Sequence, residues 1–304
     1  MLTYHHYLQN TCSCGRTLNF LTDTLPDELL NPSAEHKGTI EKFYYTTRNY
    51  MYESATGHTS AEYQKPCCVY LPYGYSNDKN YDVVFLIHGG GDNETSWLTQ
   101  LHTFRSTTMN VEQLLDKMLE SEFCAPFIAV TFTTYATTAE YGYMDYGEAS
   151  QLTPEFQNDI LPEIIRRYST YAAGTEPEQI TSARDHFAMI GYSNGSLDTF
   201  RTGLSDSLPY ISWFGCYSGN SGAEPVLEAL ANIPDEFSIR YLFTSAGDSD
   251  TQYRFVTEHY QDLLNGTSRL RDGENAYCCV VNSAGHDWTT WILSLYNSLS
   301  VFFR

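Results

Sequence analysis

The sequence has little positive charge. Seventeen Lys and Arg residues stand against 37 Asp and Glu residues, so the 304-residue chain carries a formal net charge of −20 at neutral pH. Proteins that bind nucleic acid or anionic lipid use an excess of positive charge to neutralise phosphates. The charge balance therefore argues against nucleic acid and against membrane surfaces as partners.

Long hydrophobic runs and a disulfide framework are also missing. The longest uninterrupted aliphatic or aromatic run extends only from Val83 to Ile87, whereas a membrane-spanning helix needs ~18–20 such residues. Eight cysteines are too few for a disulfide scaffold in a chain of this length. Cys12-x-Cys14 lacks the second ligand pair of a zinc site, and Cys67-Cys68 and Cys278-Cys279 are expected to pack in the core. We predict no metal site.

The composition that is present predicts a folded α/β protein. Apolar residues make up 42% of the chain and charged residues only 18%, which excludes wholesale disorder. Strand-length apolar runs alternate with amphipathic stretches, as in a mostly parallel sheet with helices on both faces. The predicted strands are 41–47, 66–71, 83–88, 127–133, 186–192, 210–217, 239–246 and 277–282. The predicted helices are 111–120, 154–168, 195–204, 225–230, 251–264 and 288–302.

Four regional expectations follow. The first two strands have no helix predicted between them and should form an antiparallel pair. Thr153-Pro154 is expected to provide an N-cap followed by proline at the first position of its helix. Residues 1–38 have no periodicity and are interpreted as a surface extension or linker before a catalytic domain at 39–304. The loop from Tyr135 to Gln151 follows a predicted strand, and binding residues are common in such loops.

The strongest chemical signal is Gly191-Tyr192-Ser193-Asn194-Gly195, which lies between a predicted strand and a predicted helix. This G-x-S-x-G pattern in a strand–turn–helix context indicates a nucleophilic serine exposed on a sharp turn. The alternative is an ordinary glycine-rich turn. The context favours Ser193 as the nucleophile.

A second glycine-rich segment, His88-Gly89-Gly90-Gly91, ends the strand at 83–88. A serine hydrolase needs two backbone amides directed at the developing oxyanion, and we expect these to be the amides of Gly90 and Asn194. Gly89 is expected to lie beside the substrate, whereas a structural role is favoured for His88.

A serine nucleophile also needs a base, and only His259 and His286 follow Ser193 in the chain. His259 lies within a predicted helix. His286 lies in a loop between the last predicted strand and helix, so His286 is the predicted base.

A serine hydrolase also needs an acid that orients the histidine, and two aspartates in Gly247-Asp248-Ser249-Asp250 are candidates. Gly247 permits a turn at the strand end, and Asp250 lies beyond that turn, where it could reach His286. Asp248 is expected to cap the turn or the following helix, and remains the alternative acid.

With these residues in place, the chain resembles the α/β-hydrolase superfamily, and within it carbohydrate esterase family one, which contains feruloyl and acetyl-xylan esterases. The likeness covers residues 39–304 through CVYLPYGY, YDVVFLIHGGGDNE, GYSNGS, SAGDSD and SAGHDWTTW. The resemblance implies a triad of Ser193, Asp250 and His286. Asn194 departs from the family, in which many members have Met after the serine.

The resemblance implies cofactor-free acyl transfer on a carbohydrate ester, most closely a feruloylated or acetylated xylan. Tyr141, Tyr143, Tyr146 and Trp288 are candidate substrate contacts because flat aromatic faces bind sugar and feruloyl rings. Alternatives are acetyl-xylan esterase, another acyl hydrolase or transferase of this fold, and a non-catalytic carbohydrate-binding module.

The expected location and context of the protein rest on the same resemblance. The acidic, tyrosine-rich composition resembles that of exported polysaccharide-degrading enzymes and favours an extracellular or cell-surface location within a larger multi-module protein. The N-terminus has no signal-peptide pattern, so a native start at Met1 would instead predict a cytoplasmic protein.

Overall fold

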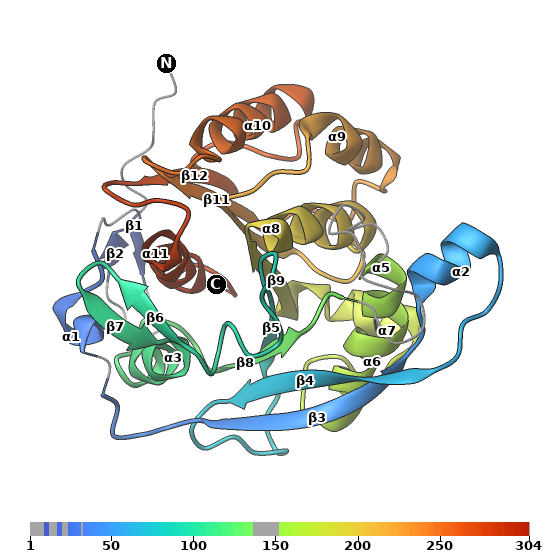
Figure 1. Ribbon diagram of the computed structural model, residues 1–304, viewed down its shortest axis with the longest axis horizontal. Helices are drawn as coiled ribbons and strands as arrows, with labels where there is room; N and C mark the ends of the chain where they lie inside the picture. Colours follow the sequence, from blue (N-terminus) through green and yellow to red (C-terminus); the bar gives the residue numbers. More distant parts are fainter. Residues whose placement is uncertain (1–8, 12–16, 20–23, 32, 136–151, 304) are drawn as a thin grey trace.

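A computed structural model describes residues 9–11, 17–19, 24–31, 33–135 and 152–303. Its centre is an eight-stranded sheet in the order β12-β11-β10-β9-β5-β8-β4-β3 (Figure 1). The strands are β3 (Thr39–Thr47), β4 (Tyr63–Leu71), β5 (Asp82–Ile87), β8 (Phe127–Phe132), β9 (Phe187–Tyr192), β10 (Trp213–Tyr217), β11 (Tyr241–Gly247) and β12 (Ala276–Val281). All eight predicted strands are present, and the predicted α/β-hydrolase architecture is confirmed.

The first two strands of the sheet are antiparallel, as predicted. β3 pairs with β4, β4 pairs with β8, and both ladders are antiparallel, whereas the ladders from β8 to β12 are parallel. The prediction of no helix between β3 and β4 is wrong, because α2 (Tyr50–Thr56) lies there. Asn49 caps α2 by accepting the Tyr52 amide, and Gly57 ends it with φ 72°, a conformation that glycine adopts without steric cost.

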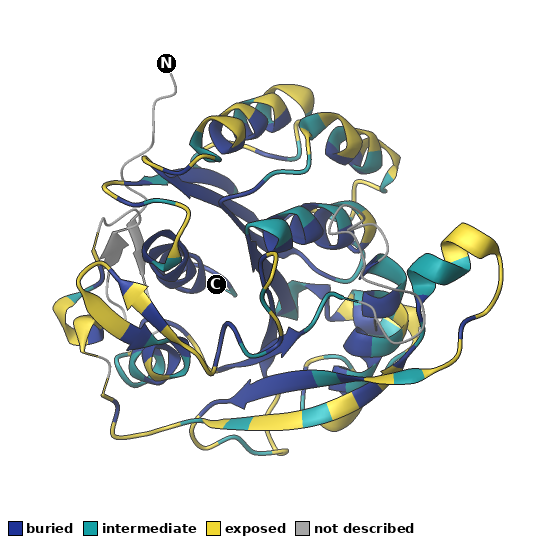
Figure 2. Ribbon diagram, in the orientation of Figure 1, coloured by how far each residue is buried: buried dark blue, intermediate teal, exposed yellow. Residues whose placement is uncertain are grey.

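Helices cover both faces of the sheet, and a separate apolar core lies under each layer. One face carries α3 (Val111–Glu120) and α11 (Trp288–Leu299). The other carries α9 (Ala223–Asn232), α10 (Tyr253–Gly266) and the helical segments after β8. Figure 2 shows the buried strands between helices whose outer sides are exposed. Cys67 and Cys68 lie in opposite cores, so their predicted packing role is confirmed.

The predicted helix at 154–168 consists of α5 (Leu152–Glu155), the π-helical η2 (Phe156–Ile160) and α6 (Leu161–Arg167). The prediction of Thr153 as N-cap is wrong, because Thr153 lies inside α5 and its hydroxyl donates to Asp206 Oδ2 at 2.6 Å. Pro162 has no amide to donate, which is consistent with the irregular hydrogen bonding of this segment. Apolar side chains spaced four residues apart, at Phe156, Ile160, Ile164 and Tyr168, all lie in the core.

The structure contains short elements that the sequence patterns did not indicate. They are β1 (Gln9–Thr11), β2 (Thr17–Asn19), α1 (Asp27–Leu30), the hairpin of β6 (Leu101–Phe104) and β7 (Thr107–Asn110), α7 (Pro177–Ser182) and η3 (Arg184–His186). Within the predicted extension, Leu25 and Leu29 are buried in the core. The boundary at residue 38 stays a prediction.

The sheet topology fixes where a site can form. β5 lies between β8, which follows it in the sequence, and β9, which comes later. Ligands of open α/β sheets bind at the carboxyl ends of strands where the strand order reverses in this way. The segments at His88 and Ser193 follow β5 and β9. No helix in the described part of the chain is long and apolar enough to cross a membrane.

Candidate active site

Ser193 occupies a strained turn between β9 and the helix α8 (Asn194–Asp198), which continues into the π-helical η4 (Thr199–Asp206). Its backbone has φ 54° and ψ −121°, a conformation that costs a non-glycine residue of order 1–3 kcal/mol. Its amide donates to Tyr217 O, at the end of the neighbouring strand, at 2.8 Å. This is the geometry of a nucleophile elbow.

The two glycines of the motif are required by close packing. A Cβ at Gly191 would lie 2.0 Å from the carbonyl oxygen of Gly195. A Cβ at Gly195 would lie 2.5 Å from the carbonyl oxygen of Ile87. The positive φ of the turn falls on Ser193 itself, so the glycines allow α8 to start directly against β5 and β9.

The structure brings the three predicted catalytic residues together. His286 Nε2 lies 3.0 Å from Ser193 Oγ, and His286 Nδ1 lies 3.0 Å from Asp250 Oδ1. The Asp250 side chain is 0% exposed and the His286 side chain 35% exposed. The carboxylate is therefore shielded from solvent while the histidine and serine remain accessible.

Asp250 is held in its ionised form. Burial raises the pKa of its carboxyl, but hydrogen bonds from His286, Ser218 and the Gln252 amide outweigh that effect, so the pKa lies below its usual value. With Asp250 accepting from Nδ1–H, the Nε2 of His286 can accept the Ser193 hydroxyl proton. This is the tautomer that a general base at Ser193 requires.

The expected helix cap by Asp248 is wrong, whereas a contact within its turn is present, because Asp248 Oδ1 accepts the Ser249 hydroxyl at 3.1 Å. The aspartate that stabilises the start of α10 is Asp250, whose Oδ1 accepts the Gln252 amide at 2.8 Å. The Asp248 carboxylate instead accepts the backbone amide of Ser283 at 2.9 Å. Asp248 thus contacts the loop that carries His286, and does not contact the histidine ring.

Both predicted oxyanion-hole amides are available. Asn194 is the first residue of α8, where an amide has no acceptor within the helix. A Cβ at Gly89 would lie 3.2 Å from Ser193 Cβ, which places the glycine-rich segment beside the nucleophile. Among the described residues, neither the Gly90 nor the Asn194 amide donates a hydrogen bond.

His88 has the structural role that was favoured for it. The ring is 2% exposed, its Nδ1 lies 2.8 Å from Gly89 O, and its Nε2 accepts the Thr134 amide at 3.1 Å. Burial lowers the pKa of this histidine. A neutral His88 therefore links the ends of β5 and β8 and fixes the backbone that leads to Gly90.

Of the predicted substrate contacts, Tyr141, Tyr143 and Tyr146 lie outside the described residues. Trp288 is partly buried and stacks on His102 with ring centroids 3.4 Å apart. It also packs edge-on against Trp97, Tyr192 and Trp291. These contacts give Trp288 a packing role next to the loop of residues 282–287 that carries His286, here called the histidine loop. The contact of Trp288 with substrate stays a prediction.

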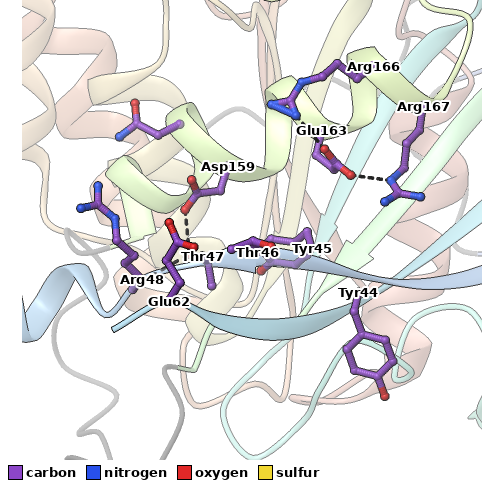
Figure 3. A pocket seen from close by; sticks show the side chains of 11 residues that line it. Tyr44, Tyr45, Thr46, Thr47, Arg48, Glu62, Asp159, Glu163, Arg166 and Arg167 are labelled. Carbon is purple, nitrogen blue, oxygen red and sulfur yellow. Dashed lines mark hydrogen bonds and ion pairs between the residues drawn. The ribbon is translucent and has the colours of Figure 1, made fainter. Parts of the chain in front are cut away.

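A polar hollow of about 360 Å³ lies apart from these residues, between β3 and the η2–α6 segment (Figure 3). Several of its charged side chains are paired. Thr47 donates to Asp159 at 2.7 Å, and Arg166 and Arg167 bind Glu163 at 2.7 and 2.6 Å. The described residues contain no group of three or more potential metal ligands.

Comparisons with known proteins agree with the fold. No protein-family model matches the chain. The chain is 28% identical over 294 residues to endo-1,4-beta-xylanase Y of Acetivibrio thermocellus, a match that spans 92% of this chain and 24% of the relative. The chain spans about a quarter of the length of the curated relatives it matches.

Solved structures give the same relationship. A mutant of the feruloyl esterase module from Clostridium thermocellum, complexed with sinapinate, has a TM-score of 0.76 at 25% identity and covers 100% of this chain and 97% of that one. The chain is an α/β-hydrolase related to the feruloyl esterases of carbohydrate esterase family one. A family-one ferulic acid esterase from Anaeromyces mucronatus, complexed with ferulic acid, shares the fold, with a TM-score of 0.71, 18% identity and coverage of 93% and 97%.

In this α/β-hydrolase, two features of the site were not predicted. The Tyr135 hydroxyl accepts the Gly91 amide at 2.7 Å, and Asp248 binds the histidine loop. Both join residues that are 35 or more positions apart. A sequence pattern records local spacing, so it carries no signal for such contacts.

Proposed function

We propose that this protein is a serine esterase that removes hydroxycinnamoyl groups, most closely feruloyl groups, from plant cell-wall polysaccharide such as arabinoxylan. The observation that carries the proposal is the chain of hydrogen-bond distances from Ser193 through His286 to Asp250, 3.0 Å at each step. This arrangement suits the activation of a serine hydroxyl for acyl transfer.

The reaction proceeds in two steps. His286 takes the proton of Ser193 as its oxygen attacks the ester carbonyl, and the amides of Gly90 and Asn194 donate to the developing oxyanion. His286 then gives the proton to the leaving sugar alcohol, which leaves an acyl-enzyme on Ser193. Water, deprotonated by His286, attacks this intermediate, and His286 then gives the proton to Ser193 Oγ as the acyl–oxygen bond breaks and the free acid leaves.

The acyl group is proposed from the relatives. The similar module from Clostridium thermocellum was solved with sinapinate, and the similar esterase from Anaeromyces mucronatus with ferulic acid. Both ligands are hydroxycinnamates. Since curated relatives are also named as xylanases, we place the substrate on xylan and the domain within a longer polypeptide that acts outside the cell.

Mutation of the nucleophile tests the chemistry. Ser193→Ala should lower turnover by ~10⁴–10⁶, the range seen when triad members are removed, and should abolish labelling by a fluorophosphonate. Ser182→Ala is a matched control, because Ser182 is an exposed residue on α7 that bonds only its own helix among the described contacts. Full activity and labelling in Ser193→Ala would exclude the mechanism.

Product analysis tests the substrate. Ferulate and acetate released from the same arabinoxylan are measured, and methyl ferulate is compared with an acetylated xylo-oligosaccharide. We expect a higher kcat/KM for methyl ferulate. The reverse order would indicate an acetyl-xylan esterase with the same triad, and no release of either acid despite ligand binding would indicate a carbohydrate-binding module.

A further inference from the structure

The turn that carries the acid and the loop that carries the base are joined along their backbones. After β11, the Asp248 amide donates to Val281 O and the Ser249 amide donates to Ala284 O, each at 3.0 Å. A Cβ at Gly247 would lie 2.2 Å from Ala284 O, so the two segments are in direct contact. The position of one segment therefore constrains the other.

The Asp248 carboxylate is the side-chain part of this junction. Its Oδ2 accepts the Ser283 amide at 2.9 Å, and its Oδ1 accepts the Ala284 amide at 3.4 Å. Ser283 has φ 53°, and successive amides around such a residue form a concavity that suits an anion. The hydrogen bond from Ser283 is the main cause that lowers the pKa of Asp248. The carboxylate thus stabilises the turn at Ser283, whose backbone is strained and which lies three residues before His286.

The loop has a second anchor on its other side. Asp287 caps α11 by accepting the Thr289 amide at 2.9 Å, and its Oδ2 accepts the Gly285 amide at 3.1 Å. This anchor fixes the loop to its own helix. The Thr290 hydroxyl also donates to Gly285 O at 2.7 Å, and Arg105 Nη2 donates to Asn282 O at 3.2 Å. Of these side-chain anchors, Asp248 is the one that ties the loop to the turn bearing the acid.

We propose that Asp248 is a positioning residue that sets His286 relative to Asp250. The proposal rests on the proposed serine esterase function. Asp248 makes no contact with the reacting atoms and acts through the backbone at Ser283 and Ala284. Misplacement of a catalytic group by about 1 Å costs up to ~100-fold in rate, and the junction is expected to prevent displacement on that scale.

Substitution of Asp248 tests the proposal. Asp248→Ala removes both acceptors and should lower kcat on methyl ferulate about 10- to 100-fold, with KM unchanged. Asp248→Asn keeps the shape of the side chain and one acceptor, so its kcat should fall less. It provides the test if the alanine variant does not fold. Asp272→Asn is the control, because Asp272 accepts the Tyr260 hydroxyl away from the triad; its kcat should equal that of the wild type.

A double-mutant cycle separates positioning from general stability. In an Asp250→Asn background the imidazole has already lost its orienting partner, so Asp248→Ala should reduce kcat much less than in the wild type. An equal reduction in both backgrounds, or a wild-type kcat in both Asp248 variants, would overturn the inference. If the wild type lacks esterase activity, or Ser193→Ala retains it, the proposed function itself fails.

Discussion

At the scale of single residues, the candidate site depends on the two nitrogens of His286 having different tasks. Nδ1 faces the buried Asp250 carboxylate and Nε2 faces Ser193. A carboxylate can accept from Nδ1–H and stabilise the imidazolium that forms in the reaction. An amide in its place can present its NH₂ group to the ring and favour the opposite tautomer.

Asp250→Asn should therefore lower kcat by up to ~10⁴. Because Oδ1 faces both His286 Nδ1 and the Gln252 amide, an NH₂ group at that position also loses the hydrogen bond at the start of α10, and we expect a loss of about 0.5–2 kcal/mol in stability with the fold retained. Steady-state kinetics on methyl ferulate and a thermal unfolding curve measure the two effects. Asp272→Asn controls for the loss of one negative charge. An active Asp250→Asn together with an inactive Asp248→Asn would identify Asp248 as the acid.

Residue-level prediction from the sequence agrees with the observed geometry where a residue type and its local spacing carry the information. Ser193 lies in G-x-S-x-G, and His286 is one of only two histidines that follow it. Asp248 lay in the same short motif as Asp250, yet its partner is 35 residues away. A turn aspartate has several acceptable partners, so local spacing favoured a cap and missed the histidine loop.

At the scale of elements, the site depends on how closely α8 approaches β5. The carbonyl oxygens of Ile87 and His88 lie 2.5 and 2.6 Å from where a Gly195 Cβ would be. Backbone atoms cannot move away as a flexible side chain can. Any side chain at position 195 must therefore shift the helix that begins at the Asn194 amide.

Gly195→Ala should destabilise the protein by about 1–3 kcal/mol through overpacking, offset in part by the helix propensity of alanine, ~1 kcal/mol better than glycine. It should also lower kcat more than tenfold, because the Asn194 amide moves. Gly174→Ala is the matched control, since the three atoms nearest to a Cβ there all belong to the Gln179 side chain, which can move. Urea unfolding measures the stability change and steady-state kinetics measure the change in kcat. Equal losses in Gly195→Ala and Gly174→Ala would contradict the packing argument.

Elements were predictable where burial and periodicity agree. The six parallel strands, β5 and β8 to β12, are buried and largely apolar because helices cover both of their faces, as expected for buried parallel strands. The antiparallel edge strand β3 is mostly exposed. The hairpin of β6 and β7 is short and half exposed, so its alternation covers only four residues per strand. α2 has no buried residue, and a helix without an apolar face has no periodic signal.

At the scale of the whole molecule, the two cores bury ionisable groups with opposite effects on stability. Burial lowers the pKa of His259 to about 4 and raises that of Asp198 to about 7. His259 is thus neutral in the fold but takes up a proton in the unfolded chain below its usual pKa of ~6.5. Asp198 is protonated in the fold but ionised in the unfolded chain above ~3.9.

These shifts predict the pH dependence of unfolding. The His259 contribution to stability is complete above ~6.5 and is lost as the pH falls towards about 4, a loss of up to about 3 kcal/mol. Glutamine at position 259 cannot titrate, so the free energy of unfolding of His259→Gln should fall less than that of the wild type on acidification, by about 2 kcal/mol at about pH 5.

Asp198→Asn tests the opposite pH direction. The Asp198 contribution to stability is present at low pH and is lost as the pH rises through about 7, so the free energy of unfolding of Asp198→Asn should fall less than that of the wild type as the pH rises. Urea titrations of the wild type and both variants across this range measure the slopes. Parallel pH profiles for the wild type and His259→Gln would mean that the histidine takes up a proton in the folded state. That result would contradict its packing against Phe200, with ring centroids 4.6 Å apart.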